Sequence, residues 1–419
     1  MGRGRIARAP EPIAIVGIGL RFPGARGTRA FWEMLCEGRI AIREVPAHRV
    51  ELGFDIDHAY DPRPGTPGKI SSKMAGFLDH PELFDPFVFG LSPRDAAAME
   101  PHQRFALEVV ADALDDAGIP HDSLMGERVA VIFGRMAEDY SREQIAVLGE
   151  DRFRRNFDVW AAAGIAGSVL SGRISFWLGT RGPSFTLDTA CSTSLLAVRL
   201  ACQSLWSGET HTAIAGGVNV FLTPEGMIAL SRVGMLAADG QIKAFDDRAN
   251  GFVRAEGAGA VVLRPLSQAL ANGDPIHALI RGTGFSADGR DGGHMMAPGR
   301  FGQAQAIRDA YERAGVAPCD VQFVETHGTG TVIGDPVEVR ALADVMGPGR
   351  PADRPLLISS VKPNIGHAEP ASGVAGLIKA TLAVEHRELP PQASFETPST
   401  AIPWDELPVR GPAARAPRP

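Results

Sequence analysis

Short apolar runs alternate along the chain with longer segments in which apolar residues recur at helical spacing. The runs are rich in β-branched residues and end at glycine, threonine or proline, which is typical of buried strands. They occupy residues 13–16, 129–133, 213–215, 260–263, 321–324 and 356–361. The helical spacing predicts helices over residues 99–117 and 303–314. Strands that alternate with helices in this way predict an α/β protein.

Two parts of the chain share one order of elements: a strand, a turn that carries a reactive side chain, and a helix. The first has its strand and turn over residues 185–191 and its helix over 192–206. The second has a strand over 356–361, a turn over 362–367 and a helix over 371–384. Both helices are apolar on nearly every face, so we expect each turn to lie in the interior. The likeness predicts an internal duplication, although no repeat is visible by identity.

Composition and charge narrow the class of protein. The chain has 419 residues, of which 44% are hydrophobic and 22% are charged, as in a globular protein with a large core. A net charge of −7 without a long basic run argues against nucleic acid and anionic membranes as partners. No apolar run reaches about 18 residues and no signal peptide is visible, so we expect a cytoplasmic protein that does not cross a membrane. Four scattered cysteines without a C-x-x-C pair argue against disulfides and structural zinc, and we expect no bound metal.

Cys191 lies where the first strand passes into the first buried helix. A thiol at the N-terminus of a helix feels the positive end of the helix dipole, which predicts a lowered pKa. Small neighbours leave room for a substrate carbonyl and for a backbone N–H that points at it. We therefore predict that Cys191 is a nucleophile and that its own backbone N–H belongs to an oxyanion hole. The ordinary interpretation, a buried inert cysteine, is assigned to Cys36, Cys202 and Cys319.

Two histidines occupy positions that favour chemistry, although a single histidine is more often structural. His327 follows the strand at 321–324 and therefore stands at the carboxyl end of a strand, where open α/β sheets place their ligand sites. His367 precedes the second buried helix, whose positive end favours a neutral imidazole that can donate from Nε2 to an oxyanion. Lys362 needs a carboxylate partner if it is buried, and Glu338 is the natural one.

The sequence resembles the ketosynthase (β-ketoacyl synthase) domain of type I polyketide synthases, within the thiolase-like superfamily. The likeness runs from Pro12 to about Leu407. Several specific segments carry it, and they follow one another in the family's order: residues 12–19 with 21–24, 188–192, 250–254, 326–331 with 334–336, and 362–367. The resemblance implies a five-layered αβαβα fold made of two similar halves.

The resemblance also implies roles for individual residues. Cys191 would accept the acyl group, and His327 and His367 would promote decarboxylation of a malonyl group and stabilise the enolate and the oxyanion. Lys362 would orient the site together with Glu338. Two threonines would hydrogen-bond the pantetheine arm of the substrate, Thr329 and Thr331.

The implied reaction is a decarboxylative Claisen condensation of a Cys-bound acyl chain with a malonyl-type extender in polyketide biosynthesis. The domain would bind no cofactor itself, because the substrate travels on the phosphopantetheine of an acyl carrier protein. A homodimer and an acyltransferase in the same assembly line are the other partners that we expect.

The last part of the sequence departs from the family pattern. We expect a flexible basic tail over residues 1–11, an N-terminal half over 12–265, a C-terminal half over 266–407 and a disordered tail over 408–419. Family domains continue into a Ser-Phe-Gly-rich loop and a last strand that are not found here, so we expect the second half to lack its last strands. His102 replaces a common glutamine, which predicts an altered surface or dimer contact.

Two alternative functions remain open at this stage. The altered end favours a truncated, non-catalytic scaffold or carrier-docking remnant. A relative that loads the acyl group but does not condense it is the other alternative. Retention of Cys191, His327 and His367 together favours the condensing enzyme over both.

Overall fold

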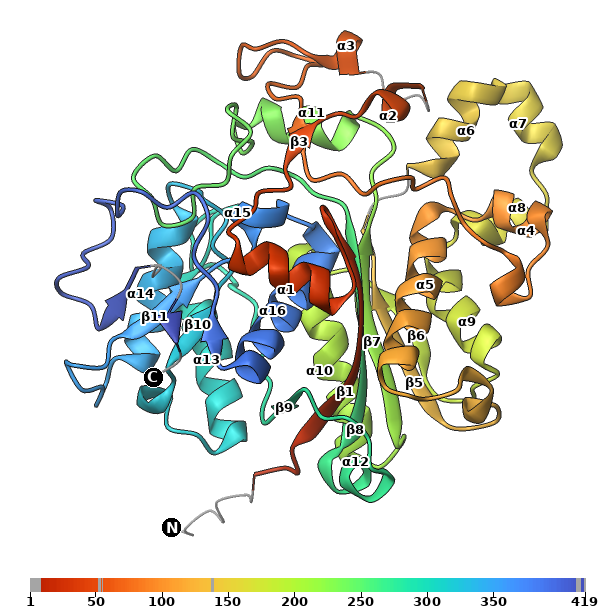
Figure 1. Cartoon of the computed structure of the whole chain (residues 1–419). Coiled ribbons are helices and arrows are strands. Elements are labelled where there is room, and N and C mark those ends of the chain that lie inside the picture. The colour runs from red at the N-terminus through yellow and green to blue at the C-terminus, as the bar shows by residue number, and fades with distance from the viewer. Residues whose placement is uncertain (1–8, 52–53, 55, 137–138, 412–415, 418–419) are drawn as a thin grey trace.

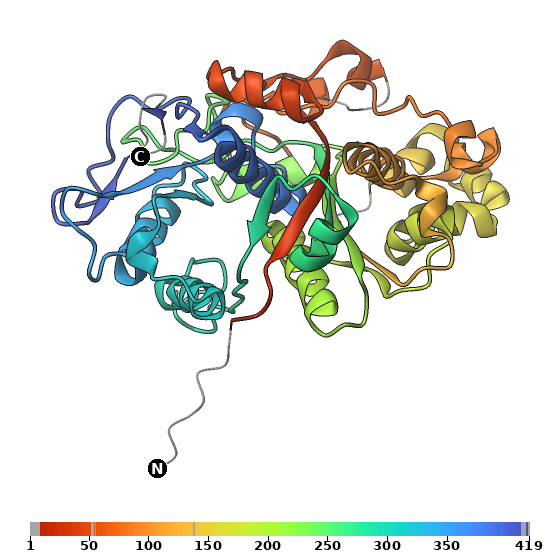
Figure 2. The same cartoon turned by 60° about the horizontal axis from the view of Figure 1, so that its bottom comes forward.

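The computed structural model describes residues 9–51, 54, 56–136, 139–411 and 416–417. The two larger sheets of the described chain alternate with layers of helices (Figure 1). The layers follow one another from α5 and α9, through the larger sheet, the helices α10 and α16 and the smaller sheet, to α13 and α14. Their bounds are Pro101–Asp116, Gly167–Leu178, Thr193–Trp206, Ser372–His386, Arg300–Ala314 and Gly334–Met346. Figure 2 shows the same arrangement from another side, with α5 in orange and α13 in cyan at opposite faces.

The larger sheet belongs mainly to the first half of the chain. Its strand order is β2-β1-β8-β7-β5-β6, and β9 also pairs with β1. The pairs β5·β6 and β5·β7 are parallel, whereas β8 is antiparallel to both β7 and β1. In the order given, with β9 last, the bounds are Ala25–Arg26, Ile13–Phe22, Gly257–Pro265, Thr212–Asn219, Val129–Gly134, Ser184–Leu187 and Ala278–Ile280.

The first strand is longer than its apolar pattern predicts. The sequence ends it at Gly17, but β1 continues to Phe22. A Cβ atom at Gly17 would come within 2.1 Å of the main-chain oxygen of Ala113, and one at Gly19 within 1.9 Å of that of Val109. Both oxygens belong to α5, so these glycines let a helix backbone approach the strand rather than end it.

The smaller sheet has three parallel strands in the order β10-β11-β13. Their bounds are Phe323–Glu325, Leu356–Ser359 and Val409–Arg410. Apolar residues of β11, α13 and α14 form one core cluster, and residues of α10, α16 and the larger sheet form another. The second half therefore holds its strands between the central helices and an outer helical layer, as the first half does.

Short elements connect these layers, and several of them lie on the upper side of the molecule in Figure 1. The helices are α1 (Thr28–Cys36), α2 (Ala47–Glu51), α3 (Ile56–Ala59), α4 (Pro93–Ala98), α6 (Tyr140–Leu148), α7 (Glu150–Asn156), α8 (Val159–Ile165), α11 (Glu225–Arg232), α12 (Leu266–Asn272) and α15 (Lys362–Ile365). The short strands are β3 (Arg43–Glu44), β4 (Met74–Ala75), β12 (Glu388–Leu389) and β14 (Ala416–Pro417).

Parts of the two predicted tails are ordered by specific contacts. The main-chain oxygen of Glu11 accepts from Trp206, and its carboxylate accepts from the N–H of Ser267. Val409 and Arg410, which the sequence analysis placed in a disordered tail, pair with β11. These three residues correct the predicted tails, whereas residues 1–8, 412–415 and 418–419 lie outside the described part of the chain.

The prediction for His102 was wrong, because its side chain is buried. Its Nδ1 lies 3.0 Å from a carboxylate oxygen of Glu100, and its Nε2 accepts from the N–H of Val220. His102 therefore joins α5 to the chain that follows β7, inside the first half, rather than forming a surface contact.

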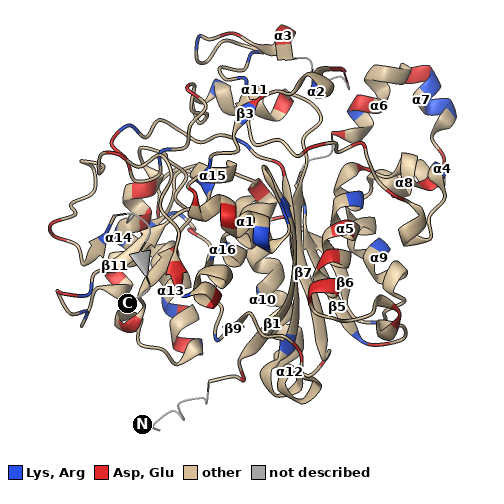
Figure 3. Ribbon diagram, in the orientation of Figure 1, with Lys and Arg blue, Asp and Glu red and all other residues tan. Residues whose placement is uncertain are grey.

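Acidic and basic residues are mixed over the helices of the described chain (Figure 3). No single helix among the described residues is long and apolar enough to cross a membrane. The helices α8 and α9 pass that test only when taken together, with a bend of 99° between them.

Candidate active site

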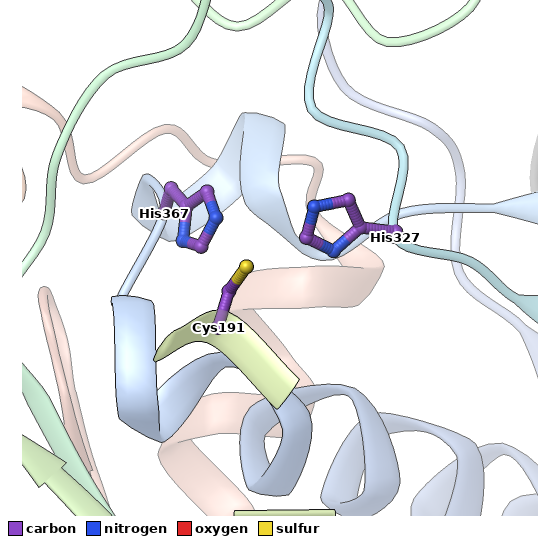
Figure 4. Close-up of side chains that lie close together, drawn as sticks. All are labelled: Cys191, His327 and His367. Carbon is purple, nitrogen blue, oxygen red and sulfur yellow. The ribbon is translucent and has the colours of Figure 1, made fainter. Parts of the chain in front are cut away.

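The side chains of the three predicted catalytic residues meet between the two halves of the molecule. The sulfur of Cys191 and one ring nitrogen each of His327 and His367 all lie within 4.8 Å of one another. Figure 4 shows the sulfur directed towards the space between the two imidazoles, whose ring centroids are 5.4 Å apart. Residues that are far apart in the sequence therefore form one constellation. The catalytic roles predicted for them stay predictions.

Each of the three residues stands at the end of a regular element. Cys191 lies in a single 3₁₀ turn, Ala190–Ser192, between β6 and α10. His327 lies in the loop after β10, and His367 lies between α15 and the 3₁₀ turn Glu369–Ala371 that opens α16. Strand ends and helix starts thus aim all three side chains at one point.

A strained turn presents Cys191. Ala190 has φ of 55°, a left-handed conformation that is uncommon for a residue with a Cβ. The N–H of Ala190 donates to the Asp188 carboxylate at 2.8 Å, and the N–H of Thr189 donates to the Thr193 hydroxyl at 2.9 Å. Such a sharp strand-to-helix turn exposes the side chain that follows it, which is what a nucleophile requires.

The first turn does not lie in the interior, contrary to the prediction. Asp188, Thr189 and Ala190 are exposed, and only Cys191 is half-buried. The reason is that β6 is the last strand of its sheet, so the turn that follows it also lies at the edge. The second turn, in contrast, is buried from Lys362 onward, as expected.

The pKa of the Cys191 thiol is raised rather than lowered, which corrects the sequence analysis. Burial is the main cause, and the nearby charge of Lys362 lowers the pKa only in part. The helix dipole alone predicts a lowered pKa. It does not account for desolvation, because the atoms that bury the thiol come from distant segments. The resting thiol is therefore neutral, and its proton must leave as the sulfur attacks.

His367 is held as a hydrogen-bond donor. Its Nδ1 accepts from the backbone N–H of Glu369 at 2.9 Å and lies 2.9 Å from the hydroxyl of Ser372. Burial lowers the pKa of His367 well below its ordinary value, and the charge of Lys362 lowers it further. A neutral ring that accepts at Nδ1 carries its proton on Nε2. The direction agrees with the sequence analysis, but burial is its first cause.

His327 is fixed through its main chain. Its N–H donates to Glu338 at 2.6 Å, and the N–H of Gly328 donates to the second carboxylate oxygen at 2.8 Å. The ammonium of Lys362 donates to the carbonyl oxygen of His327 at 2.5 Å. Although His327 is exposed on one side, the surrounding protein disfavours its charged form and lowers its pKa, and Lys362 lowers it further.

The predicted pair of Lys362 and Glu338 is not a direct ion pair in the described chain. The two side chains instead bind opposite ends of the His327 backbone, one as donor and one as acceptor. Burial raises the pKa of Glu338 to about 7, although two N–H donors favour its charged form. Burial also lowers the pKa of Lys362. Sequence reasoning found both residues, but the way in which they act together differs.

Thr329 and Thr331 lie on the loop that follows His327. Their hydroxyl oxygens are 3.1 Å apart, and Thr329 is buried whereas Thr331 is partly exposed. Asp335 fixes the loop by accepting the N–H groups of Gly330 and Phe245 at 3.1 and 2.7 Å. The hydroxyls therefore occupy a fixed loop beside the constellation, and their predicted contact with pantetheine stays a prediction.

Three residues around His367 were missed as functional candidates. The carboxylate of Glu369 forms a buried ion pair with Arg254, and the ring of Phe252 lies 5.1 Å from that of His367. Residues 250–254 were noticed only as part of a family resemblance. A lone Arg in a loop and a Glu at a helix start give no signal that they meet.

The donor set itself admits two interpretations, a metal site and a nucleophile with its donors. Thiolate and imidazole are also ligands of zinc. The ammonium of Lys362 interacts electrostatically with Cys191, His327 and His367, and a positive charge there opposes a cation. We therefore favour the nucleophile, and the absence of a metal stays a prediction.

Comparison with family models identifies the class of protein. Residues 10–269 match the model described as beta-ketoacyl synthase, N-terminal domain, and residues 277–396 match the beta-ketoacyl synthase, C-terminal domain. The chain therefore belongs to the β-ketoacyl synthase family.

The relatives are components of polyketide synthases. One component of the phenolphthiocerol/phthiocerol polyketide synthase of Mycobacterium tuberculosis is 48% identical over 399 residues, which are 95% of this chain and 25% of that protein. Another component of the same synthase is 44% identical over 412 residues, 97% of this chain and 21% of that protein. The chain spans about a quarter of the length of these curated relatives.

Solved ketosynthases have the same fold. The oxazolomycin ketosynthase domain of Streptomyces albus JA3453 superposes with a TM-score of 0.90 at 37% identity, over 97% of this chain and 70% of that one. The ketosynthase from module 6 of the bacillaene synthase of Bacillus subtilis 168 gives 0.86 at 38%, over 97% and 67%. The predicted family, thiolase-like fold and enzyme class, a condensing acyltransferase, are confirmed, and the scaffold alternative is not favoured.

Proposed function

We propose that this β-ketoacyl synthase joins a Cys191-bound acyl chain to a malonyl-type extender by decarboxylative Claisen condensation. The observation that carries the proposal is the meeting of the Cys191 sulfur with one nitrogen of each histidine within 4.8 Å. A nucleophile and two neutral donors at this separation can serve one substrate carbon in turn.

The first step loads the enzyme. The Cys191 sulfur attacks the thioester carbonyl of the incoming acyl chain, and the backbone N–H of Cys191 donates to the oxyanion that forms. The carbon–sulfur bond to the carrier then breaks, and the thiol proton of Cys191 ends on the released carrier thiol. His327 would pass this proton, and the nearness of its ring nitrogen to the sulfur supports that role.

The second step extends the chain. The bond between the malonyl methylene and its carboxylate breaks and releases CO₂, leaving an enolate whose oxygen accepts from Nε2–H of His367. The enolate carbon attacks the Cys191 thioester, and the bond to sulfur breaks. The Cys191 thiolate then takes up a proton from solvent. Preorganised hydrogen-bond donors in a site that excludes part of the water stabilise both oxyanions more than bulk water would.

The substrates would reach this site on the phosphopantetheine of an acyl carrier protein, and the extender would be loaded by an acyltransferase of the same assembly line. The hydroxyls of Thr329 and Thr331 support this proposal, because they line the loop beside His327 and can donate to the amides of the arm. No separate cofactor is needed for the chemistry.

A homodimer is the quaternary state that we propose. The strand β6 pairs only with β5 among the described strands, so its other edge is open. Phe185 on β6, Phe176 on α9 and Leu195 on α10 are exposed apolar side chains. An open strand edge with apolar neighbours is stabilised by pairing with a second copy.

We also propose a cytoplasmic location, with which the free thiols of Cys191, Cys202 and Cys319 agree.

The test separates loading from condensation. Incubation with acetyl-N-acetylcysteamine thioester should add one acetyl group to the wild-type protein and none to Cys191→Ala. Addition of malonyl carrier protein should then release CO₂ and lengthen the chain. Loading without extension would favour the acyl-transferring alternative, and no loading would contradict both.

A further inference from the structure

The turn that holds His367 repeats the geometry of the turn that holds Cys191. Glu369 has φ of 46°, close to the 55° of Ala190, and each opens its 3₁₀ turn. In each turn the N–H of the left-handed residue donates to the side chain two residues earlier, which is Asp188 in one case and His367 in the other. The left-handed conformation of Glu369 therefore aims its N–H at the imidazole.

Glu369 is held in this uncommon conformation by a buried ion pair. Its two carboxylate oxygens contact Nε and Nη2 of Arg254, the latter at 2.8 Å, and Asn219 donates to the same carboxylate at 3.2 Å. Arg254 and Glu369 are only 4% and 6% exposed. A two-pronged contact of this kind fixes direction as well as distance. It offsets the cost of a left-handed residue that bears a side chain.

Arg254 is itself locked by its surroundings. Its guanidinium lies over the ring of Phe221, 4.6 Å from the centroid. A Cβ atom at Gly226 would come within 2.5 Å of Nη1, so the arginine fills space that only a glycine leaves. The neighbours of Arg254 also hold the main chain of His367: the N–H of His367 donates to Val253 at 2.7 Å, and the N–H of Ala255 donates to His367 at 2.8 Å.

We propose that Arg254 and Glu369 are positioning residues that keep the proton of His367 on Nε2, facing Cys191. The inference rests on the proposed role of His367 and adds the device that maintains it. When the Glu369 N–H is lost from Nδ1, that nitrogen becomes free to bind a proton, and the ring can change tautomer or become charged. Neither state serves the enolate as the neutral Nε2–H does.

Several charged or titratable groups face His367 and set its protonation. Lys362, His327 and Arg254 oppose a positive ring, the N–H of Glu369 donates to its Nδ1, and the Cys191 sulfur lies within 4.8 Å of one ring nitrogen. Loss of the Glu369 N–H removes a contact that only the unprotonated Nδ1 can accept. The acid limb of the pH profile for decarboxylation should therefore move to higher pH in variants of the pair.

The test compares two half-reactions in Glu369→Gln and Arg254→Lys. Loading of Cys191 from acetyl-N-acetylcysteamine thioester should stay within about threefold of wild type, because His367 is not needed as a donor to the enolate in that step. Decarboxylation of malonyl-N-acetylcysteamine thioester should fall roughly 10- to 100-fold in kcat with little change in KM, by analogy with the loss of the hydrogen-bond partner of a metal-ligating histidine. Asp274→Asn, which breaks the Arg264–Asp274 pair at the far end of β8, is the control and should change neither reaction.

The outcomes separate this inference from the proposed function. Wild-type decarboxylation in His367→Ala would overturn the role of His367 and, with it, the inference. Loss of decarboxylation in His367→Ala, with an unmoved acid limb in Glu369→Gln, would overturn the inference alone. An equal fall of loading and decarboxylation would mean a merely structural pair and would also overturn it. If Glu369→Gln does not fold, Arg254→Lys carries the same test with the buried charge retained.

Discussion

The ammonium of Lys362 lies 2.5 Å from the main-chain oxygen of His327, and the lysine is buried. On the other side of the same residue, Glu338 accepts the N–H groups of His327 and Gly328. An ammonium and a carboxyl group thus hold one histidine without forming an ion pair with each other in the described chain. The position of the His327 imidazole depends on both.

Removal of the Lys362 charge should therefore impair decarboxylation. In Lys362→Met a buried, charge-assisted hydrogen bond worth roughly 1.5–3 kcal/mol is lost, which corresponds to about a 10- to 100-fold lower rate. The rate of CO₂ release from malonyl-N-acetylcysteamine thioester measures the effect. Lys73→Met, at a more exposed lysine paired with Asp57, is the control. A wild-type rate in Lys362→Met would contradict the proposed support of His327.

The raised pKa of Cys191 gives an alkylation profile that can be checked. Because burial favours the neutral thiol, the thiolate fraction should still be rising at pH 9. Alkylation of Cys191 by iodoacetamide, followed by mass spectrometry of its peptide, should accelerate through this pH without a plateau. Cys202, whose pKa burial raises to about 12, should stay unmodified in the folded protein. A plateau near neutral pH for Cys191 would restore the helix-dipole interpretation.

Glu338 should make the protein less stable as the pH rises. Its pKa is raised from 4.5 to about 7, so between these values the folded state keeps a proton that the unfolded chain releases. The free energy of unfolding therefore falls as the pH increases across this interval. In Glu338→Gln the fall should be smaller, as measured by urea unfolding from pH 5 to pH 7.

Other groups that titrate in this window are present in both proteins, and Asp335 also interacts electrostatically with Glu338. Asp335, with a pKa raised to about 6, has the same sign as Glu338, and the two imidazoles have the opposite sign. Glu33→Gln, on the exposed face of α1, serves as the matched control and should keep the wild-type slope. An identical slope in Glu338→Gln would refute the prediction.

The open edge of β6 should mediate self-association. Phe185→Lys places a charge on that strand and should raise the dissociation constant of the dimer at least about tenfold, since like charges would meet across the two-fold axis. Size-exclusion chromatography with light scattering reports the change. Phe301→Lys, at an exposed phenylalanine on α13, should leave the association unchanged. A monomeric wild type, or a dimer insensitive to Phe185→Lys, would exclude this edge.

Much of the fold was predictable because periodicity is a local property. The helices α5, α10, α13 and α16 begin and end within a few residues of the predicted spans. The length of β1 was not predictable, because Gly17 reads as a strand end when only its neighbours are considered. Gly17 is required there because the backbone of α5, almost a hundred residues further along the chain, packs against it.

The three residues that meet at the candidate site were singled out from the sequence, but the contacts that fix them were not. Cys191, His327 and His367 lie at ends of elements, which is a signal that a single sequence carries. The pKa of Cys191 and the partners of Lys362 depend on atoms supplied by other segments. The ion pair of Arg254 and Glu369 was not predictable for the same reason, because its two members come from different halves of the chain.

The equivalence of the two turns also bears on how the enzyme tolerates change. The separation of sulfur and imidazole is fixed where α10 and α16 begin, and these neighbouring helices share one apolar core. The long connection at residues 285–299 leads into α13, a helix of the outer layer. Insertions there can diversify the outer surface while the reacting centre keeps its dimensions.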